Sequence, residues 1–316
     1  MIVFYMRGKL FNTLIALITL FTLLFVFAGC QEEAPAPAPA PAPTPIPAPS
    51  TDITPKPAQL RVRVATTTSL YDTGLWGYLE PMFEEKYGVE LDVLYTGSGQ
   101  ALEYGRRGDV DALTVHDKPN ELKFVSDNYS KERVPFAYNY FLIVGPAADP
   151  AGIKGMAPDA ALKKLKETAS ASFISRGDNS GTHNMEKRLW EKAGYKYGEV
   201  QNAGAWYVQA GSGMGPVLQM ASEKAGYTLT DMGTYVAFKS QLNLMPIVDK
   251  GSDLLNVYSV LAINPEKVTV AKNLKMAQNM ITFLSSPEVQ DLIGKYGVKE
   301  YGIQLFVPCA GKEPTS

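Results

Sequence analysis

The sequence predicts an α/β protein in which strands and helices alternate from about residue 61 onward. Short β-branched runs recur between segments whose apolar residues repeat at helical spacing, and this alternation is typical of parallel sheets covered by helices. Glycines and hydroxyl residues stand where four of the strands give way to helices. Residues before about 60 have a different composition and are not expected to belong to the fold.

The predicted elements follow one another along the chain. We expect strands at 61–65, 89–95, 111–115, 138–144, 172–175, 206–209 and 257–263, and helices at 75–86, 101–107, 184–193, 216–223, 271–284 and 287–296. In the first of these helices Leu75, Leu79 and Phe83 recur at the spacing that places side chains on one face. The stretch is long enough for one large domain or two modest ones.

Residues 1–30 have the layout of a secretory signal that ends in a lipoprotein cleavage site. Arg7 and Lys9 precede an almost wholly apolar run at 10–27, and the sequence Ala-Gly-Cys ends at Cys30. The apolar run alone could also span a bilayer as an uncleaved anchor. Small residues before a cysteine favour lipidation of Cys30, because an uncleaved helix has no use for them. Both interpretations place the remainder outside the cytoplasmic membrane, on its outer face.

The segment 31–58 is an Ala/Pro-rich tether. Its prolines exclude a helix and favour extended polyproline II at about 3.1 Å per residue, so the two dozen residues at 34–57 reach roughly 75 Å. A disordered spacer is the alternative and leads to the same topology. With a formal net charge of −2, the chain is not expected to bind nucleic acid. If Cys30 carries lipid, Cys309 has no partner for an intramolecular disulfide.

Four turns at the carboxyl ends of strands are rich in glycine and hydroxyl residues. In open α/β sheets ligands bind at this edge, and the free N–H groups at a helix start favour an anion. Ser and Thr also cap helices in many proteins, so one such turn would be weak evidence for a site. Four turns, one of them with an arginine, predict a convergent anion site; they lie at 66–69, 96–99, 176–183 and 211–215.

The candidate ligand-binding residues are mostly hydrogen-bond donors. Arg176 adds a planar fork that can bind two oxygens at once. A fully deprotonated oxyanion such as tungstate, molybdate or sulfate needs donors only, whereas phosphate near neutral pH needs an acceptor for its proton. Asp178 could be that acceptor, or it could cap the following helix or brace Arg176. The predicted binding residues are Thr67, Thr68, Ser69, Ser98, Arg176, Ser180, Gly181 and Thr182.

Enzyme signatures do not fit the sequence. The glycines at 97–99 and 211–215 continue neither as a dinucleotide fingerprint nor as a P-loop, and no Gly-x-Ser-x-Gly nucleophile elbow occurs. His116 and His183 stand far apart and neither has the spacing of a metal-ligand pair. His183 could touch the anion site or only pack at a helix start. We therefore expect a binding protein without catalytic residues, cofactor or cationic metal.

The turns resemble those of the substrate-binding proteins of bacterial and archaeal tungstate ABC transporters. The most specific matches are Thr-Thr-Thr-Ser at 66–69 and Arg-Gly-Asp-Asn-Ser-Gly-Thr-His at 176–183, and further matches lie at 71–75, 97–102, 105–109 and 227–231. The resemblance implies a two-lobed type II periplasmic-binding-protein fold with the ligand cleft between the lobes. It assigns 59–140 and 256–316 to lobe 1 and 141–255 to lobe 2.

The resemblance also implies a function. Lobe 1 would supply Thr67, Thr68 and Ser98, facing Arg176, Ser180 and Thr182 of lobe 2. A monomer held by its lipid anchor would capture tungstate with high affinity and deliver it to an ABC permease. Molybdate or phosphate binding on the same fold, or an oxyanion sensor, are the alternatives.

Two positions depart from the family pattern. Met232 stands where relatives usually carry an arginine, and the segment 117–119 after His116 is more polar than usual. If the missing arginine helps to bind the anion or close the lobes, affinity or selectivity would differ in this chain. Neither change removes a predicted binding residue.

Overall fold

The structure, a computed structural model, describes residues 60–270 and 273–314. They belong to one compact unit, Lys56–Ser316. The predicted leader with Cys30 and the tether at 31–58 lie outside the described residues. Within the described part of the chain, none of the helices is long and apolar enough to cross a membrane.

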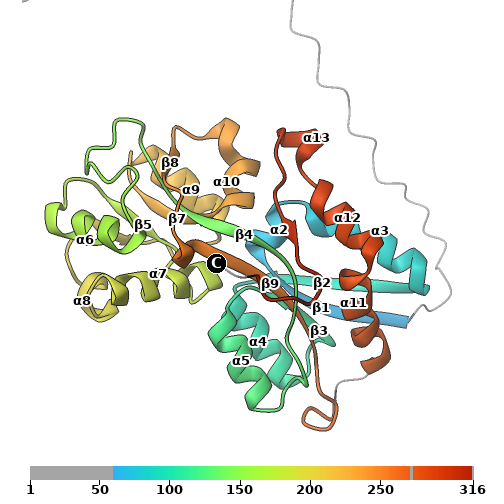
Figure 1. Cartoon of the computed structure of the whole chain (residues 1–316). Coiled ribbons are helices and arrows are strands. Elements are labelled where there is room, and N and C mark those ends of the chain that lie inside the picture. Colours follow the sequence, from blue (N-terminus) through green and yellow to red (C-terminus); the bar gives the residue numbers. More distant parts are fainter. Residues whose placement is uncertain (1–59, 271–272, 315–316) are drawn as a thin grey trace, which may run out of the picture. The chain divides into compact units, whose positions relative to one another are not determined.

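The larger sheet has eight strands: six lie in the order β10-β4-β9-β3-β1-β2, and two more pair with the far end of β4 (Figure 1). β1 lies between β3 and β2 and pairs in parallel with both. The six strands are β1 (Leu60–Thr67), β2 (Val89–Thr96), β3 (Ala112–Val115), β4 (Val134–Gly145), β9 (Leu255–Ala262) and β10 (Val307–Pro308).

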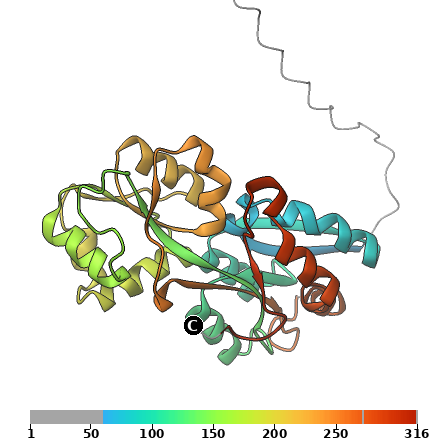
Figure 2. The same cartoon turned by 45° about the horizontal axis from the view of Figure 1, so that its top comes forward.

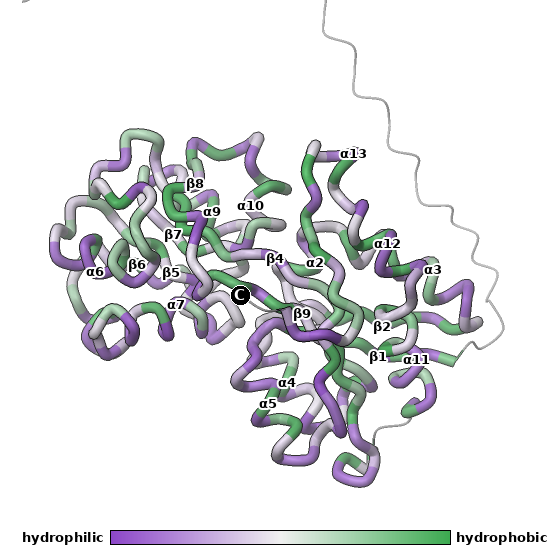
Figure 3. Tube along the Cα trace, viewed as in Figure 1, coloured by the Kyte–Doolittle hydropathy of each residue, from purple (hydrophilic) through white to green (hydrophobic). Residues whose placement is uncertain are grey.

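Helices cover this sheet and enclose an apolar core. Phe83 and Phe283 meet edge to face with ring centroids 5.3 Å apart, and Trp76 is buried beside them. Figure 3 shows hydrophilic residues among the hydrophobic ones on outer helices such as α5, as expected of helices with one face in water. The helices of this half are α2 (Thr68–Asp72), α3 (Leu75–Tyr87), α4 (Ser98–Arg107), α5 (Lys118–Ser126), α11 (Leu274–Ser285), α12 (Pro287–Lys295) and α13 (Val298–Tyr301).

The second half has its own strands and its own core, which centres on Trp190, Phe173 and Tyr207. β5 and β6 form a parallel pair. The strands are β5 (Phe173–Ser175), β6 (Tyr207–Gln209), β7 (Thr228–Asp231) and β8 (Met245–Val248), and the helices are α6 (Pro158–Thr168), α7 (Gly181–Lys192), α8 (Tyr197–Gln201), α9 (Met214–Glu223) and α10 (Met232–Phe238), with 3₁₀ turns η1 (Lys239–Gln241) and η2 (Ser252–Leu254).

Two neighbouring strands connect the halves. β4 pairs with β9 as far as Tyr140 opposite Leu255, and from Phe141 onward it pairs with β7 and then β8. Figure 2 shows β4 and β9 side by side between the halves. This change of partner supports our proposal that lobe 1 comprises 59–140 and 256–316, and lobe 2 comprises 141–255.

The α/β class predicted from the sequence is confirmed, but the expectation of parallel sheets holds for only part of the pairing. β4 leaves lobe 1 and β9 returns to it, so the two crossings run in opposite directions and pair antiparallel. β9 is also antiparallel to β3, and β7 and β8 are antiparallel to β4. Parallel pairing is confined, among the described strands, to β1 with its two neighbours and β5 with β6, apart from an isolated parallel bridge beside β5.

Candidate anion-binding site

Arg176 lies directly after β5 and reaches from lobe 2 to lobe 1. Its side chain is 2% exposed. Its Nη2 donates to Asp178 Oδ2 at 2.6 Å and to the Thr68 hydroxyl of α2 at 3.3 Å. Ser175, one residue earlier, donates to the buried carboxyl of Glu186 on α7 at 2.6 Å, which fixes the end of β5 against that helix. The guanidinium is therefore held at the junction of the lobes.

Three of the four predicted turns begin helices at this junction. Thr67 caps α2 by accepting from Leu70 N at 3.3 Å, and Ser180 caps α7 by accepting from His183 N at 3.2 Å. Gly97 is the cap of α4 and has no side chain to offer. Because Thr67 and Ser180 accept hydrogen bonds as caps, their hydroxyl protons remain available for an anion. Capping and anion binding are therefore compatible at these residues.

The fourth turn differs from the others. Gly213 caps α9, which lies beside α2. Gly215 packs against the ring of Phe238, which a Cβ on this glycine would approach to 2.7 Å. This turn therefore packs Gly215 against an apolar side chain.

The turns of the two lobes approach each other closely. A Cβ built on Gly97 in lobe 1 would lie 3.2 Å from Ser180 Cα in lobe 2. A Cβ on Gly181 would lie 2.9 Å from both Ser98 Oγ and the His116 carbonyl oxygen of lobe 1. A Cβ at Gly181 would not fit without a shift and one at Gly97 would be tight, so the two lobes are in close contact at the predicted site.

Three buried donors at this junction have no hydrogen-bond partner among the described residues. They are Ser98 Oγ, Arg176 Nε and Thr182 Oγ1. A buried donor without a partner costs about 1–3 kcal/mol, and most such groups in proteins are paired. Ser98 comes from lobe 1 and the other two from lobe 2. Buried donors without partners on both sides of the junction are what an anion held between the lobes would require.

The Ser69 hydroxyl has partners within lobe 1. Its Oγ lies 3.0 Å from His116 Nε2. Asn256 donates its amide to Asn139 and Tyr258, so its oxygen accepts from His116 Nδ1 at 2.8 Å. His116 Nε2 then carries no proton and accepts from the Ser69 hydroxyl. If Ser69 binds the anion as predicted, its backbone N–H is the donor that remains.

The buried imidazole of His116 gives a pH-dependent stability. Burial lowers the pKa of His116 to about 4, whereas an unfolded histidine titrates near 6.5. Neutral His116 therefore makes its full contribution to the unfolding free energy above pH 6.5. This contribution falls by roughly 3 kcal/mol as pH decreases toward 4. We expect the difference in unfolding free energy between wild type and His116→Gln, measured by urea unfolding, to shrink over this interval. A difference that stays constant from pH 7 to pH 4 would contradict a buried neutral His116.

Asp178 is committed to neighbours within lobe 2. One carboxylate oxygen accepts from Arg176, and the other accepts from Ser180 N at 3.1 Å. Burial opposes ionisation of Asp178, but the Arg176 charge and the Ser180 hydrogen bonds outweigh it and hold its pKa below the ordinary value. Asp231, by contrast, caps α10 through Thr234, and burial raises its pKa. Asp178 therefore braces Arg176 as an anion.

His183 has both ring nitrogens engaged within lobe 2. Its Nδ1 accepts from Asn179 N at 2.9 Å, and its Nε2 lies 2.6 Å from the Tyr197 hydroxyl. Burial lowers the pKa of His183 to about 4. These contacts match the interpretation of a helix-start histidine that packs and positions the turn.

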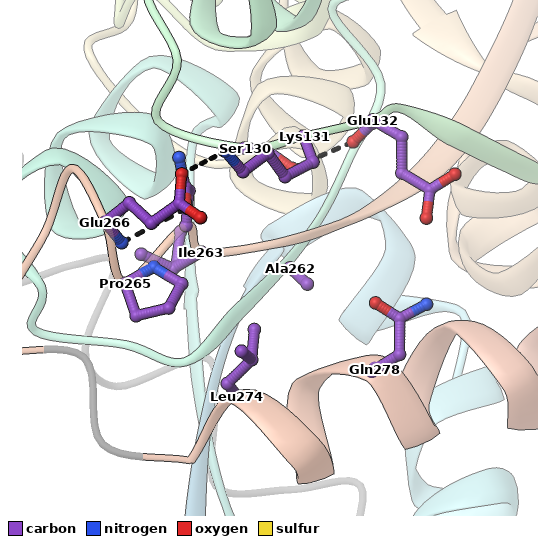
Figure 4. Close-up of a pocket in the computed structure, with 10 residues that line it drawn as sticks. Ser130, Lys131, Glu132, Ala262, Ile263, Pro265, Glu266, Leu274 and Gln278 are labelled. Atoms are coloured by element: carbon purple, nitrogen blue, oxygen red, sulfur yellow. Dashed lines mark hydrogen bonds and ion pairs between the residues drawn. The ribbon is translucent and has the colours of Figure 1, made fainter.

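A surface pocket elsewhere on lobe 1 shares no residue with this site (Figure 4). The Ser130 hydroxyl there donates to the Glu132 carbonyl at 2.8 Å, and Lys131 pairs with Glu266. The hydroxyl of Ser130 and the charges of Lys131 and Glu266 thus have partners of their own, unlike Ser98 Oγ, Arg176 Nε and Thr182 Oγ1 at the junction.

Two α/β lobes joined by adjacent crossing strands, with helix starts converging at their junction, define the class of two-lobed solute-binding proteins. In agreement, the family model described as a PBP superfamily domain matches residues 51–288.

Individual relatives narrow this class. Tungstate-binding protein TupA of Peptoclostridium acidaminophilum is 44% identical over 251 residues, which cover 78% of this chain and 85% of the relative. The structure of TupA from Desulfovibrio alaskensis G20 is 41% identical with a TM-score of 0.66, covering 79% of this chain and 99% of that one. The tungstate ABC transporter structure from Geobacter sulfurreducens is 45% identical with a TM-score of 0.66, and the match covers 75% of this chain and 98% of that one. The chain belongs to this family of ABC-transporter substrate-binding proteins within the PBP superfamily, which confirms the predicted resemblance and fold.

Proposed function

We propose that this chain binds tungstate between its lobes and delivers it to an ABC permease. The observation that carries the proposal is the set of buried donors without partners, Ser98 Oγ, Arg176 Nε and Thr182 Oγ1. Thr67, Thr68, Ser180 and the N–H groups of Gly181 and Ser69 would complete the site. The relatives whose names specify tungstate support the choice of anion.

The chemistry of the site favours a fully deprotonated oxyanion. Both oxygens of Asp178 already accept hydrogen bonds from within lobe 2, so part of the acceptor capacity that hydrogen phosphate would need is in use. Six charge-assisted hydrogen bonds at about 1.5–3 kcal/mol each give roughly 9–18 kcal/mol before desolvation and lost ligand freedom are subtracted. The remainder is compatible with micromolar to nanomolar binding.

Calorimetric titration of the purified full-length protein with tungstate, molybdate, sulfate and phosphate tests the proposal. We expect one-to-one binding of tungstate, with sulfate and phosphate much weaker, and the same experiment ranks molybdate. Binding of phosphate alone would replace the ligand while keeping the site. No binding of any of the four anions would overturn the proposed function.

Asp178 provides a prediction about selectivity. Asp178→Asn removes an ionised carboxylate beside the bound anion, so we expect phosphate affinity to rise about tenfold, or from undetectable to measurable. Calorimetric titration of wild type and variant with phosphate measures the change. A fall in phosphate affinity would instead identify Asp178 as the acceptor of the phosphate proton.

The predicted leader and tether complete the proposal. Lipidation of Cys30 would anchor a monomer at the outer face of the cytoplasmic membrane, and the segment 31–58 would let the lobes reach the permease. Incorporation of labelled palmitate by the wild-type protein, and its loss in Cys30→Ala, would test the anchor. Retained labelling in the variant would rule out Cys30 as the lipidated residue.

A further inference from the structure

We infer that Asp117 of lobe 1, with Asn184 and Arg188 of lobe 2, forms a latch that determines how long the closed protein retains its anion. The inference rests on the proposed function, because it concerns release of the same bound oxyanion. None of the three residues is among the predicted anion-binding residues.

The latch is centred on a fully buried carboxylate. Asp117 follows β3 and precedes α5, and its side chain is 0% exposed. Its Oδ2 accepts from Asn184 Nδ2 at 2.6 Å and from Asn120 Nδ2 of its own lobe at 2.6 Å. Its Oδ1 accepts from Arg188 Nη1 at 3.3 Å. Two of these three partner side chains thus come from the opposite lobe.

One helix connects the latch to the anion site. α7 begins with Gly181 and Thr182 at the junction, and it carries Asn184 and Arg188 on a single face at positions four residues apart. On the lobe 1 side, Asp117 directly follows His116, whose carbonyl lies against Gly181. Any movement that brings Thr182 toward the anion therefore also brings Asn184 to Asp117.

The free energy of these contacts favours the closed form over the open form. If the lobes separate, Asp117 loses Asn184 and Arg188 but gains water, so the contact stabilises only the closed form. The Asn184 hydrogen bond is short and made to a buried charge, which places it among the stronger hydrogen bonds. Arg188 is 36% exposed, so its ion pair with Asp117 is screened and weaker. Asn184 should therefore contribute more than Arg188.

The test is stopped-flow measurement of tungstate association and dissociation with the purified full-length protein. Asn184→Ala is expected to dissociate about tenfold faster and Arg188→Gln about threefold faster, with association little changed. Lys192→Gln is the matched control: it removes the same charge from the same helix, but Lys192 pairs with Asp253 of its own lobe. Its dissociation rate should equal that of wild type.

The result that would overturn the latch is a dissociation rate within twofold of wild type in both Asn184→Ala and Arg188→Gln. Weaker binding that arises only from slower association would overturn it as well. Unchanged melting temperatures of the ligand-free variants would separate the latch from a general loss of stability, and Arg188→Gln changes a partly exposed residue and should fold. Failure of wild type to bind tungstate would instead refute the proposed function.

Discussion

Replacing Arg176 by alanine is expected to weaken tungstate binding by about two to four orders of magnitude. The guanidinium is buried and is the cation among the predicted binding residues, and it also holds Asp178 and Thr68 in place. Removing one partner of a buried ion pair costs about 3–5 kcal/mol, which corresponds to a loss of two to four orders of magnitude. Calorimetric titration with tungstate measures the loss.

Arg176→Lys should recover little of this affinity, and we expect it to remain about a hundredfold weaker than wild type. A lysine ammonium keeps the charge but cannot face Asp178, Thr68 and an oxyanion with one planar fork. Arg107→Ala is the control, because Arg107 is an exposed arginine that pairs with Asp109 on the surface. Undiminished tungstate affinity in Arg176→Ala would contradict the role assigned to this residue.

Gly181→Ala is expected to weaken tungstate binding about ten- to hundredfold without lowering the stability of the ligand-free protein. The added methyl group would lie 2.9 Å from Ser98 Oγ and from the His116 carbonyl oxygen, both in the opposite lobe. Overpacking of this kind costs about 1–3 kcal/mol, and here the cost falls only on the closed form. Titration calorimetry and thermal unfolding without ligand measure the two quantities.

Gly77→Ala is the matched control for this substitution. Gly77 lies inside α3, and a Cβ there meets no atom within 4 Å. Gly77→Ala should leave the tungstate affinity unchanged. Because alanine favours a helix more than glycine does, it should stabilise the fold by about 0.5–1 kcal/mol. Equal affinities of Gly181→Ala and wild type would show that the lobes need not approach this closely when the anion binds.

The sequence predicted most of the strands and helices on which the site is built, because each turn is a local pattern of strand end, small residues and helix start. α2 was missed because its five residues, Thr68–Asp72, are too few to show a helical period. β7 and α10 were missed for a similar reason, since each is short and Asp231 joins them directly.

Other features of the site depend on contacts between distant residues. The antiparallel pairing of β4 with β9 joins segments more than 100 residues apart, and no local pattern records its direction. The hydroxyl of Ser69 resembles any other donor in the sequence, and only the fold places His116 beside it. Asp117 and Asn184 are likewise neighbours only after the lobes meet.

The adjacency of the two crossing strands limits how the lobes can move. Asn139 of β4 and Asn256 of β9 stand directly opposite each other in the ladder, and their side chains also hydrogen-bond at 2.8 Å. Strands fastened together in this way resist twisting and sliding, and they permit bending about one axis. Opening is then a hinge motion of one lobe relative to the other about a single axis. Two reporter dyes, one on each lobe, would therefore report the open and closed forms as two distances whose populations follow occupancy, which is the property that an optical oxyanion sensor requires.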